Sequence, residues 1–250
     1  MELHRGADVP DTARDEAEDM NASVLTANAL QKTFGTTRAL AGVDLVVTRG
    51  ESVAIMGASG SGKTTLLHVL AGITAPDAGR VTFAPASGAA LEVTALGESE
   101  RSRLRRESFG FVFQQGLLIP ELTAIENVSL ALMINGTPRR AAEEHAAGWL
   151  ASLGLAGMEQ RRIGELSGGQ AQRVAIARAQ VTGAEIVFAD EPTGALDSHT
   201  SSEVMDALLW STTGQGRTLV VVTHDSSVAQ RCSRIVHVRD GRIVQTEVAA

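Results

Sequence analysis

The chain contains no tyrosine, and aromatic residues make up only 3% of its 250 residues. Surfaces that bind nucleic acid usually combine basic and aromatic side chains on one face, and no stretch of this sequence has that character. The only cysteine is Cys232, so an internal disulfide is excluded, and we expect a small core or surface residue rather than a reactive thiol. No apolar run approaches the roughly 18 residues of a membrane-spanning helix. The N-terminus lacks the apolar core of a signal peptide, so we expect none.

Negative charge is concentrated at the start of the chain. The first 21 residues hold seven acids and two arginines, which give −5 of the net charge of −7 and leave −2 for the remainder. Because so polar a segment buries little apolar surface, residues 1–22 are predicted to be a disordered acidic tail. Hydrophobic residues make up 44% of the chain, enough for one domain with a smaller subdomain. We place that domain at residues 23–246.

Residues 57–64 match the phosphate-binding pattern G-x-x-x-x-G-K-[ST]. An apolar run precedes them and Thr-Leu-Leu-His-Val-Leu follows, so the expected context is strand, loop and helix, which disfavours an ordinary glycine-rich turn. Glycines let the backbone wrap around a polyphosphate, with N–H groups and a helix N-terminus facing it. Lys63 would reach the β- and γ-phosphates and Thr64 would bind Mg²⁺. The predicted ATP-binding residues of this loop are Gly57, Ala58, Ser59, Gly60, Ser61, Gly62, Lys63, Thr64 and Thr65.

Two further segments narrow the class of protein. Residues 166–170 read Leu-Ser-Gly-Gly-Gln, and residues 186–191 read Ile-Val-Phe-Ala-Asp-Glu, an apolar run that ends in two acids. With the phosphate-binding loop, these motifs resemble the ATP-binding subunit of an ABC (ATP-binding cassette) transporter, over about residues 24–244. The resemblance implies an α/β fold of the P-loop NTPase type. Its core would be a mainly parallel sheet, with an N-terminal antiparallel β subdomain and a helical subdomain inserted at about 115–165.

The resemblance also assigns catalytic roles to single residues. Asp190 would hold Mg²⁺ through water, opposite Thr64, and Glu191 would be the general base that polarises the attacking water. His224 resembles the family's switch histidine, which contacts the γ-phosphate. Gln114 resembles the glutamine that touches Mg²⁺ and the water, and senses the γ-phosphate.

The resemblance implies roles for further residues, and for two of them the sequence leaves an alternative open. Gln115 is the alternative to its neighbour, but Gln114 is favoured because it directly follows the run Phe-Val-Phe. Phe34 is the candidate for stacking on adenine because tyrosine is absent, and the alternative is packing in the core. Asp197, within Ala-Leu-Asp, resembles the loop through which the two subunits of a dimer communicate.

The resemblance implies a head-to-tail dimer that encloses two Mg-ATP molecules. In such a dimer the signature segment binds the ATP held by the partner, through the N-terminus of its helix. The chain has one copy of each motif, so a homodimer is the simplest way to complete two sites; pairing with a related subunit stays open. The signature residues are Ser167, Gly168, Gly169 and Gln170.

The amino-acid sequences of two motifs indicate a group within the family. Residues 109–114 and 190–198 are most similar to the group that includes MacB-type and lipoprotein-releasing subunits. This implies an ATPase at the cytoplasmic face of the cell membrane that drives a separate permease, as an exporter or a transmitter of force. The region after Gln114 and the first inserted helices would contact that permease.

Two other functions remain as alternatives. A non-transport ABC ATPase acting on nucleic acid or ribosomes is disfavoured because coiled-coil heptads and a second cassette are absent. A regulatory subunit that binds ATP without useful turnover is disfavoured by the intact Glu191 and His224. The expected ligands are therefore ATP and Mg²⁺, and no nucleic-acid partner is expected.

Overall fold

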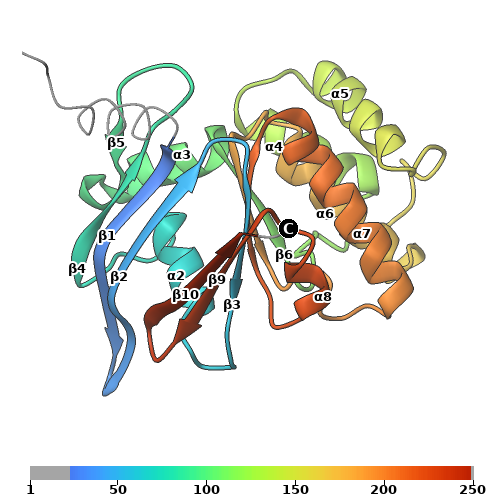
Figure 1. The fold of residues 1–250 in the computed structure, drawn as a ribbon. Coiled ribbons are helices and arrows are strands. Elements are labelled where there is room, and N and C mark those ends of the chain that lie inside the picture. Colours follow the sequence, from blue (N-terminus) through green and yellow to red (C-terminus); the bar gives the residue numbers. More distant parts are fainter. Residues whose placement is uncertain (1–22, 249–250) are drawn as a thin grey trace, which may run out of the picture.

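The structure, a computed structural model, describes residues 23–248 and contains two β-sheets (Figure 1). The predicted acidic tail, residues 1–22, lies outside the described residues. The first sheet is antiparallel, in the order β2-β1-β4-β5. The second has the order β10-β9-β3-β8-β7-β6. The first sheet comprises β1 (Ser23–Phe34), β2 (Thr37–Thr48), β4 (Ala78–Phe83) and β5 (Leu91–Glu92).

The second sheet is parallel except at one edge. Within the described range, β9, β3, β8, β7 and β6 run parallel, and β10 pairs antiparallel with β9. The α/β fold with a mainly parallel sheet and an N-terminal antiparallel sheet is thereby confirmed. The strands of the second sheet are β3 (Ser52–Met56), β6 (Phe109–Phe113), β7 (Ile186–Asp190), β8 (Thr218–Val222), β9 (Arg234–Arg239) and β10 (Arg242–Val248).

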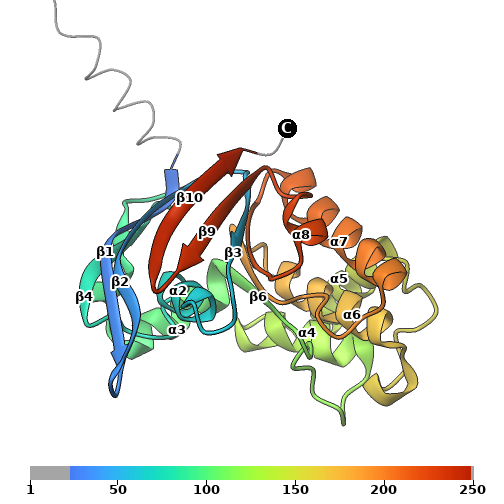
Figure 2. The same cartoon turned by 60° about the horizontal axis from the view of Figure 1, so that its bottom comes forward.

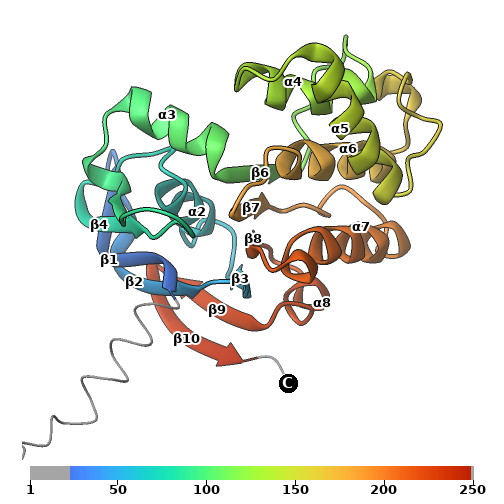
Figure 3. The same ribbon diagram turned by 90° about the horizontal axis from the view of Figure 1, so that it is seen from above.

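The helices cover the parallel sheet and extend beyond its β6 edge. Between β6 and α6 lie α4 and α5, and Figure 3 shows them together at the end of the molecule remote from β1 and β4. Helix α4 contacts both α5 and α6. The helices are α2 (Lys63–Leu70), α3 (Glu98–Glu107), α4 (Ala124–Ile134), α5 (Arg139–Ser152), α6 (Gly168–Gln180), α7 (Ser198–Ser211) and α8 (Ser226–Ala229). Short 3₁₀ turns occupy Val93–Ala95, Ile163–Glu165 and Thr213–Gln215.

Two hydrophobic cores lie on the two faces of the parallel sheet. Because successive side chains of a strand point to opposite faces, Phe188 belongs to the core shared with the antiparallel sheet and α2, whereas Val187 and Ala189 belong to the core under α4–α7. In β8, all five residues are buried. A strand covered on both faces reads as a continuous apolar run, which explains why these strands could be recognised in the sequence.

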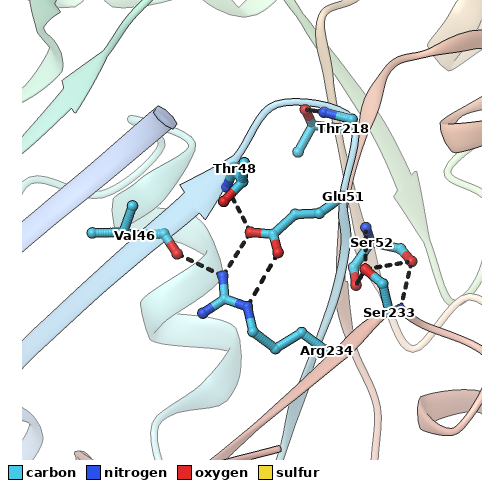
Figure 4. A network of polar contacts seen from close by, with 8 residues as sticks. Val46, Thr48, Glu51, Ser52, Thr218, Ser233 and Arg234 are labelled. Atoms are coloured by element: carbon cyan, nitrogen blue, oxygen red, sulfur yellow. Dashed lines mark hydrogen bonds and ion pairs between the residues drawn. The ribbon is translucent and has the colours of Figure 1, made fainter. Parts of the chain in front are cut away.

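An ion pair links the ends of the two sheets (Figure 4). Arg234 at the start of β9 forms a bidentate contact with Glu51, with nitrogen–oxygen distances of 2.6 and 3.1 Å. The same guanidinium donates to the Val46 carbonyl at 2.6 Å, and Glu51 accepts from the Thr48 amide at 2.6 Å. The end of β2 is therefore tied to β9. In Figure 2 the β9–β10 hairpin lies between β2 and β3, and its turn accepts a hydrogen bond from the Ala41 amide.

Candidate nucleotide-binding site

The phosphate-binding loop follows β3 and runs directly into α2. Two of its glycines are required by their surroundings. Gly57 has φ of +154°, and a Cβ there would lie 2.2 Å from the Val238 carbonyl oxygen; Gly62 has φ of +103°, and its Cβ would lie 2.2 Å from the Ala39 carbonyl oxygen. Any larger residue would push the loop away from these backbones. The tight packing of the loop leaves the N-terminus of α2 open towards a pocket.

This pocket has a volume of about 520 Å³ and brings together the predicted residues of three sequence regions. Lys63 is buried, and its ammonium donates to the carbonyls of Gly57 and Ala58 at 2.8 and 2.9 Å. It therefore points back along the loop, where a phosphate chain would pass. The pocket is lined by Ala39, Ser59, Gly60, Gly62, Lys63, Thr64, Thr65, Glu191 and His224.

Thr64 and Asp190 meet beside this pocket and form an oxygen-rich pair. The Thr64 hydroxyl donates to the Asp190 carboxylate at 3.2 Å. Burial raises the pKa of the Asp190 carboxyl above its ordinary value, against the opposing hydrogen bond from Thr64. No cluster of three or more acidic, histidine or cysteine side chains suited to a metal occurs within residues 23–248. A partly buried carboxylate and a hydroxyl nonetheless fit Mg²⁺, which takes few protein ligands and completes its shell with phosphates and water.

Glu191 and His224 come from the ends of adjacent strands and contact each other. His224 Nδ1 lies 2.8 Å from a carboxylate oxygen of Glu191. The Glu191 amide donates to the Val222 carbonyl of β8 at 2.9 Å, and its φ of +48° turns the chain sharply out of β7. The carboxylate can accept a proton from a water in the pocket, and the imidazole beside it can stabilise that water or a phosphate oxygen.

Gln114 lies at the edge of this arrangement, directly after β6. Its side chain is exposed and packs against the turn that follows Glu191: a Cβ at Gly194 would come within 3.0 Å of Gln114 Nε2. Gln115 is also exposed. The structure thus brings Gln114 next to the predicted catalytic acid. The roles of Gln114, Glu191 and His224 stay predictions.

Phe34 ends β1 at the tip of the β1–β2 hairpin and is 53% exposed, so the alternative of core packing is wrong. The Lys32 ammonium lies 5.4 Å from the centre of its ring, which is a cation–π contact. Lys32 is held by an ion pair with Asp77 at 2.9 Å. Because half of the residue is exposed, the ring can stack on a flat aromatic group such as a base.

The signature segment lies away from the pocket, on the side of α7. Ser167 caps α6, accepting from the Gln170 amide at 3.2 Å while its own amide donates to the Gln170 side chain at 2.9 Å. A Cβ at Gly169 would meet Thr200 at 2.4 Å. Asp197 caps α7 by accepting from two backbone amides at 3.0 Å, and these bonds lower its pKa. Of the described residues that line the pocket, none belongs to the signature segment.

Ala39 is the pocket residue that sequence reasoning missed. It belongs to β2, outside every motif, and reaches the pocket because its carbonyl packs on Gly62. A small apolar residue near the start of a strand carries no chemical signal, so only the tertiary structure reveals its place.

The geometry above defines a P-loop nucleotide-binding protein: a phosphate-binding loop after a central parallel strand, with Asp190, Glu191 and His224 at neighbouring strand ends. The ABC transporter family profile matches residues 40–194. The solved dimer of MJ0796, described as a bacterial ABC transporter cassette, is 37% identical, covers 90% of this chain and 99% of its own, and has a TM-score of 0.80. The chain therefore belongs to the ABC transporter family, as its motifs predicted, and it is an ATPase cassette of that family.

Curated relatives come from export systems. The chain is 48% identical over 205 residues to the pyoverdine export ATP-binding/permease protein PvdT of Pseudomonas fluorescens, which covers 82% of this chain and 30% of PvdT. It is 46% identical over 210 residues to the macrolide export ATP-binding/permease protein MacB 1/2 of Paracoccus denitrificans, again 30% of that protein. The predicted similarity to the MacB-type group is thus confirmed. The chain spans less than a third of the length of these two relatives. Among the described helices, none has the length and apolar character needed to cross a membrane.

Proposed function

We propose that this chain binds Mg-ATP in the pocket above the phosphate-binding loop and hydrolyses it. Lys63 and the loop amides hold the phosphates, Thr64 and Asp190 hold Mg²⁺ with Gln114, and Phe34 stacks on the base. The observation that carries the proposal is the 2.8 Å contact between His224 and Glu191 at the wall of a phosphate-binding pocket. It supplies a base and an orienting group where the attacking water must lie. A solved MJ0796 dimer of 36% identity is described as a post-hydrolysis state with ADP and Pi.

The functional unit in this proposal is a homodimer. The signature residues Ser167–Gln170 cap a helix whose N-terminus carries partial positive charge, yet the pocket of the same chain is lined without them. A second copy, arranged head to tail, would bring its signature segment to the ATP of the first. Asp197, which starts α7 beside the signature segment, would then lie at the contact between the two subunits.

The partner in this proposal is a membrane permease, and the cassette is held at the cytoplasmic face through it. A groove of about 260 Å³ lies between α3, β6, α4 and α6, and Ile134 in its lining is 59% exposed. Leu117, whose carbonyl is bound by Arg178 of the same lining, is also 59% exposed. Large exposed apolar side chains around a groove are typical of a docking surface. Relatives named as export ATP-binding/permease proteins favour an export system, and they favour transport over a function on nucleic acid or ribosomes.

The enzymatic part is tested by comparing ATP hydrolysis by the wild-type chain and Glu191→Gln. The amide cannot accept a proton from water, so we expect the rate to fall by about 100-fold or more while ATP binding is retained. Lys63→Ala serves as the control that loses binding. Equally low rates in the wild type and in Glu191→Gln would contradict the proposal that the chain is an active ATPase.

The transport part is tested by capture from solubilised native membranes with Glu191→Gln and ATP, followed by mass spectrometry. Recovery of one polytopic permease supports the proposal. A matched capture with Lys63→Ala, which should not form the ATP-bound dimer, identifies background proteins. Recovery of only ribosomal or DNA-associated proteins would overturn the transport assignment and leave the ATPase assignment intact.

A further inference from the structure

Helix α6 holds the turn that carries Gln114 through three side-chain hydrogen bonds. The buried Gln172 amide donates to the Phe113 carbonyl at 2.9 Å. The two amino groups of the Arg178 guanidinium donate to the carbonyls of Gly116 and Leu117, each at 2.7 Å. These acceptors lie on both sides of Gln114, so one helix fixes the backbone before and after it.

The backbone that Arg178 binds has an unusual conformation. Gly116 has φ of +67° and Leu117 has φ of +48°, a region that residues other than glycine rarely adopt. Leu117 is 59% exposed, so burial of its own side chain does not impose this conformation. Such strained residues persist when their surroundings hold them, and they are concentrated at functional sites. Here the guanidinium binds both carbonyls and supplies the restraint.

Arg178 has no acidic partner among the described residues. It is half-buried, and it donates hydrogen bonds to the two carbonyls of the turn. An arginine that served only to form an ion pair would face a carboxylate. A planar fork of donors instead matches two adjacent carbonyl oxygens, which a lysine ammonium cannot match in the same way. Arg178 therefore binds the backbone of the turn rather than a carboxylate.

We call the hydrogen bonds from Gln172 and Arg178 to this turn the clamp. The strand before the turn and the helix that carries the clamp pack closely together. A Cβ at Gly110 of β6 would lie 2.3 Å from the Ala179 carbonyl oxygen of α6, so strand and helix are in direct backbone contact. On its other side, the Gln114 side chain packs against Gly194 in the turn after Glu191. The turn is therefore held between α6 and the catalytic loop.

We propose that Arg178 and Gln172 are positioning residues that hold Gln114 where it meets Mg²⁺ and the attacking water. The proposal rests on the ATPase function and on the role of Gln114 given above. Because the signature residue Ser167 caps α6, the same helix joins the segment that would contact the partner's ATP to the residue that would sense the chain's own ATP. Loss of the clamp should impair the chemical step more than the binding of ATP, since a small misplacement of a catalytic group slows the reaction strongly.

The first test measures the clamp without catalysis, by amide hydrogen exchange of the nucleotide-free protein. In Arg178→Lys we expect exchange in residues 114–118 to rise about tenfold, with little change in the phosphate-binding loop. The matched control is Arg140→Lys, because Arg140 is exposed and forms an ion pair with Glu144 on the surface of α5. Unchanged exchange in Arg178→Lys would overturn the proposal whether or not the protein hydrolyses ATP.

The second test asks whether Arg178 acts through Gln114. We expect Arg178→Lys and Gln172→Met to lower kcat by about tenfold, with the KM for ATP within about twofold and a higher Mg²⁺ concentration for half-maximal activity. In a Gln114→Ala background the same changes should lower kcat by less than about twofold, because the positioned group is gone.

The outcomes separate this proposal from the ATPase proposal. Equal loss of kcat in both backgrounds, or loss that follows a lower melting temperature, would mean that Arg178 has only a structural role. A wild-type protein that does not hydrolyse ATP while Arg178→Lys shows faster exchange would remove the ATPase function and leave the clamp as a backbone restraint without the catalytic role proposed for it.

Discussion

Two adjacent carboxylates at the end of β7 have different partners, and the backbone of Glu191 is the reason. Asp190 is the last residue of the strand and accepts a hydrogen bond from Thr64. At Glu191 the φ of +48° turns the chain, so that the second carboxylate contacts His224 instead. If β7 continued as a strand, successive side chains would point to opposite faces of the sheet, and the Glu191 carboxylate would be directed away from the face that Asp190 uses. A local conformation that costs energy thereby places the second carboxylate beside His224, where the proposed mechanism needs it.

Cys232 is a single residue whose chemistry can be predicted from its surroundings. Burial raises the pKa of its thiol from 9.0 to about 11, and only 1% of the residue is exposed. At pH 8 the native thiolate population is therefore about 100-fold lower than for a free thiol. We expect native protein to react with iodoacetamide at least that much more slowly than protein in urea, as measured by mass spectrometry over time. Equal rates with and without urea would show that the thiol is accessible in the folded protein.

Strands and loops could be predicted from the sequence where their own residues determine the local structure. The apolar run 186–190 is a buried parallel strand, and the glycine pattern at 57–64 forms the expected loop between strand and helix. The clamp of Arg178 on the turn after β6 could not be predicted, because it pairs residues about 60 positions apart through backbone carbonyls that look alike in any sequence. The place of Ala39 in the pocket could not be predicted either, because it depends on a tertiary contact between its carbonyl and Gly62. Phe34 lies on the surface because the β1–β2 turn projects it, which hydrophobicity alone does not indicate.

The pair of Glu51 and Arg234 joins elements of both sheets, and its loss should destabilise the fold. The two side chains are only 16% and 20% exposed, so neither charge is fully compensated by water when the other is removed. We expect Glu51→Gln to lower the free energy of unfolding by about 2 kcal/mol. Urea denaturation followed by circular dichroism measures this change.

A surface pair provides the control for that prediction. Arg140 and Glu144 in α5 are 93% and 66% exposed. Glu144→Gln should therefore change the free energy of unfolding by less than about 0.5 kcal/mol. If the two glutamine variants were equally stable, the contact between Glu51 and Arg234 would contribute no more than an ordinary surface ion pair.

Over the whole molecule, the two helix N-termini that are predicted to bind phosphates are separate. The N-terminus of α2 opens into the pocket, whereas the N-terminus of α6 is packed beside Thr200 and the loop before α7. A folded single chain thus places its phosphate-binding loop at the pocket and its signature segment away from it. A signature segment can reach a pocket if it comes from a second chain, as in the head-to-tail dimer that we propose.

Substitution of Ser167 tests this arrangement, because Ser167 is exposed and lies outside the pocket. In the proposed dimer, Ser167→Arg places a bulky side chain between the signature segment and the partner's ATP. We expect ATP binding to the monomer to be retained, whereas ATP-dependent dimerisation of Glu191→Gln and hydrolysis by the otherwise wild-type chain are lost. Light scattering after gel filtration, with and without ATP, measures the dimer.

The control is Ser167→Ala, which removes the helix cap at a cost of about 1 kcal/mol without adding bulk. If this variant still forms the dimer, loss of dimerisation in Ser167→Arg is due to the obstruction rather than to fraying of α6. Lys63→Ala supplies the opposite pattern, since it should lose ATP binding itself. Loss of ATP binding in Ser167→Arg to the same degree as in Lys63→Ala would mean that the signature segment supports the pocket of its own chain, and the dimer proposed here would be wrong.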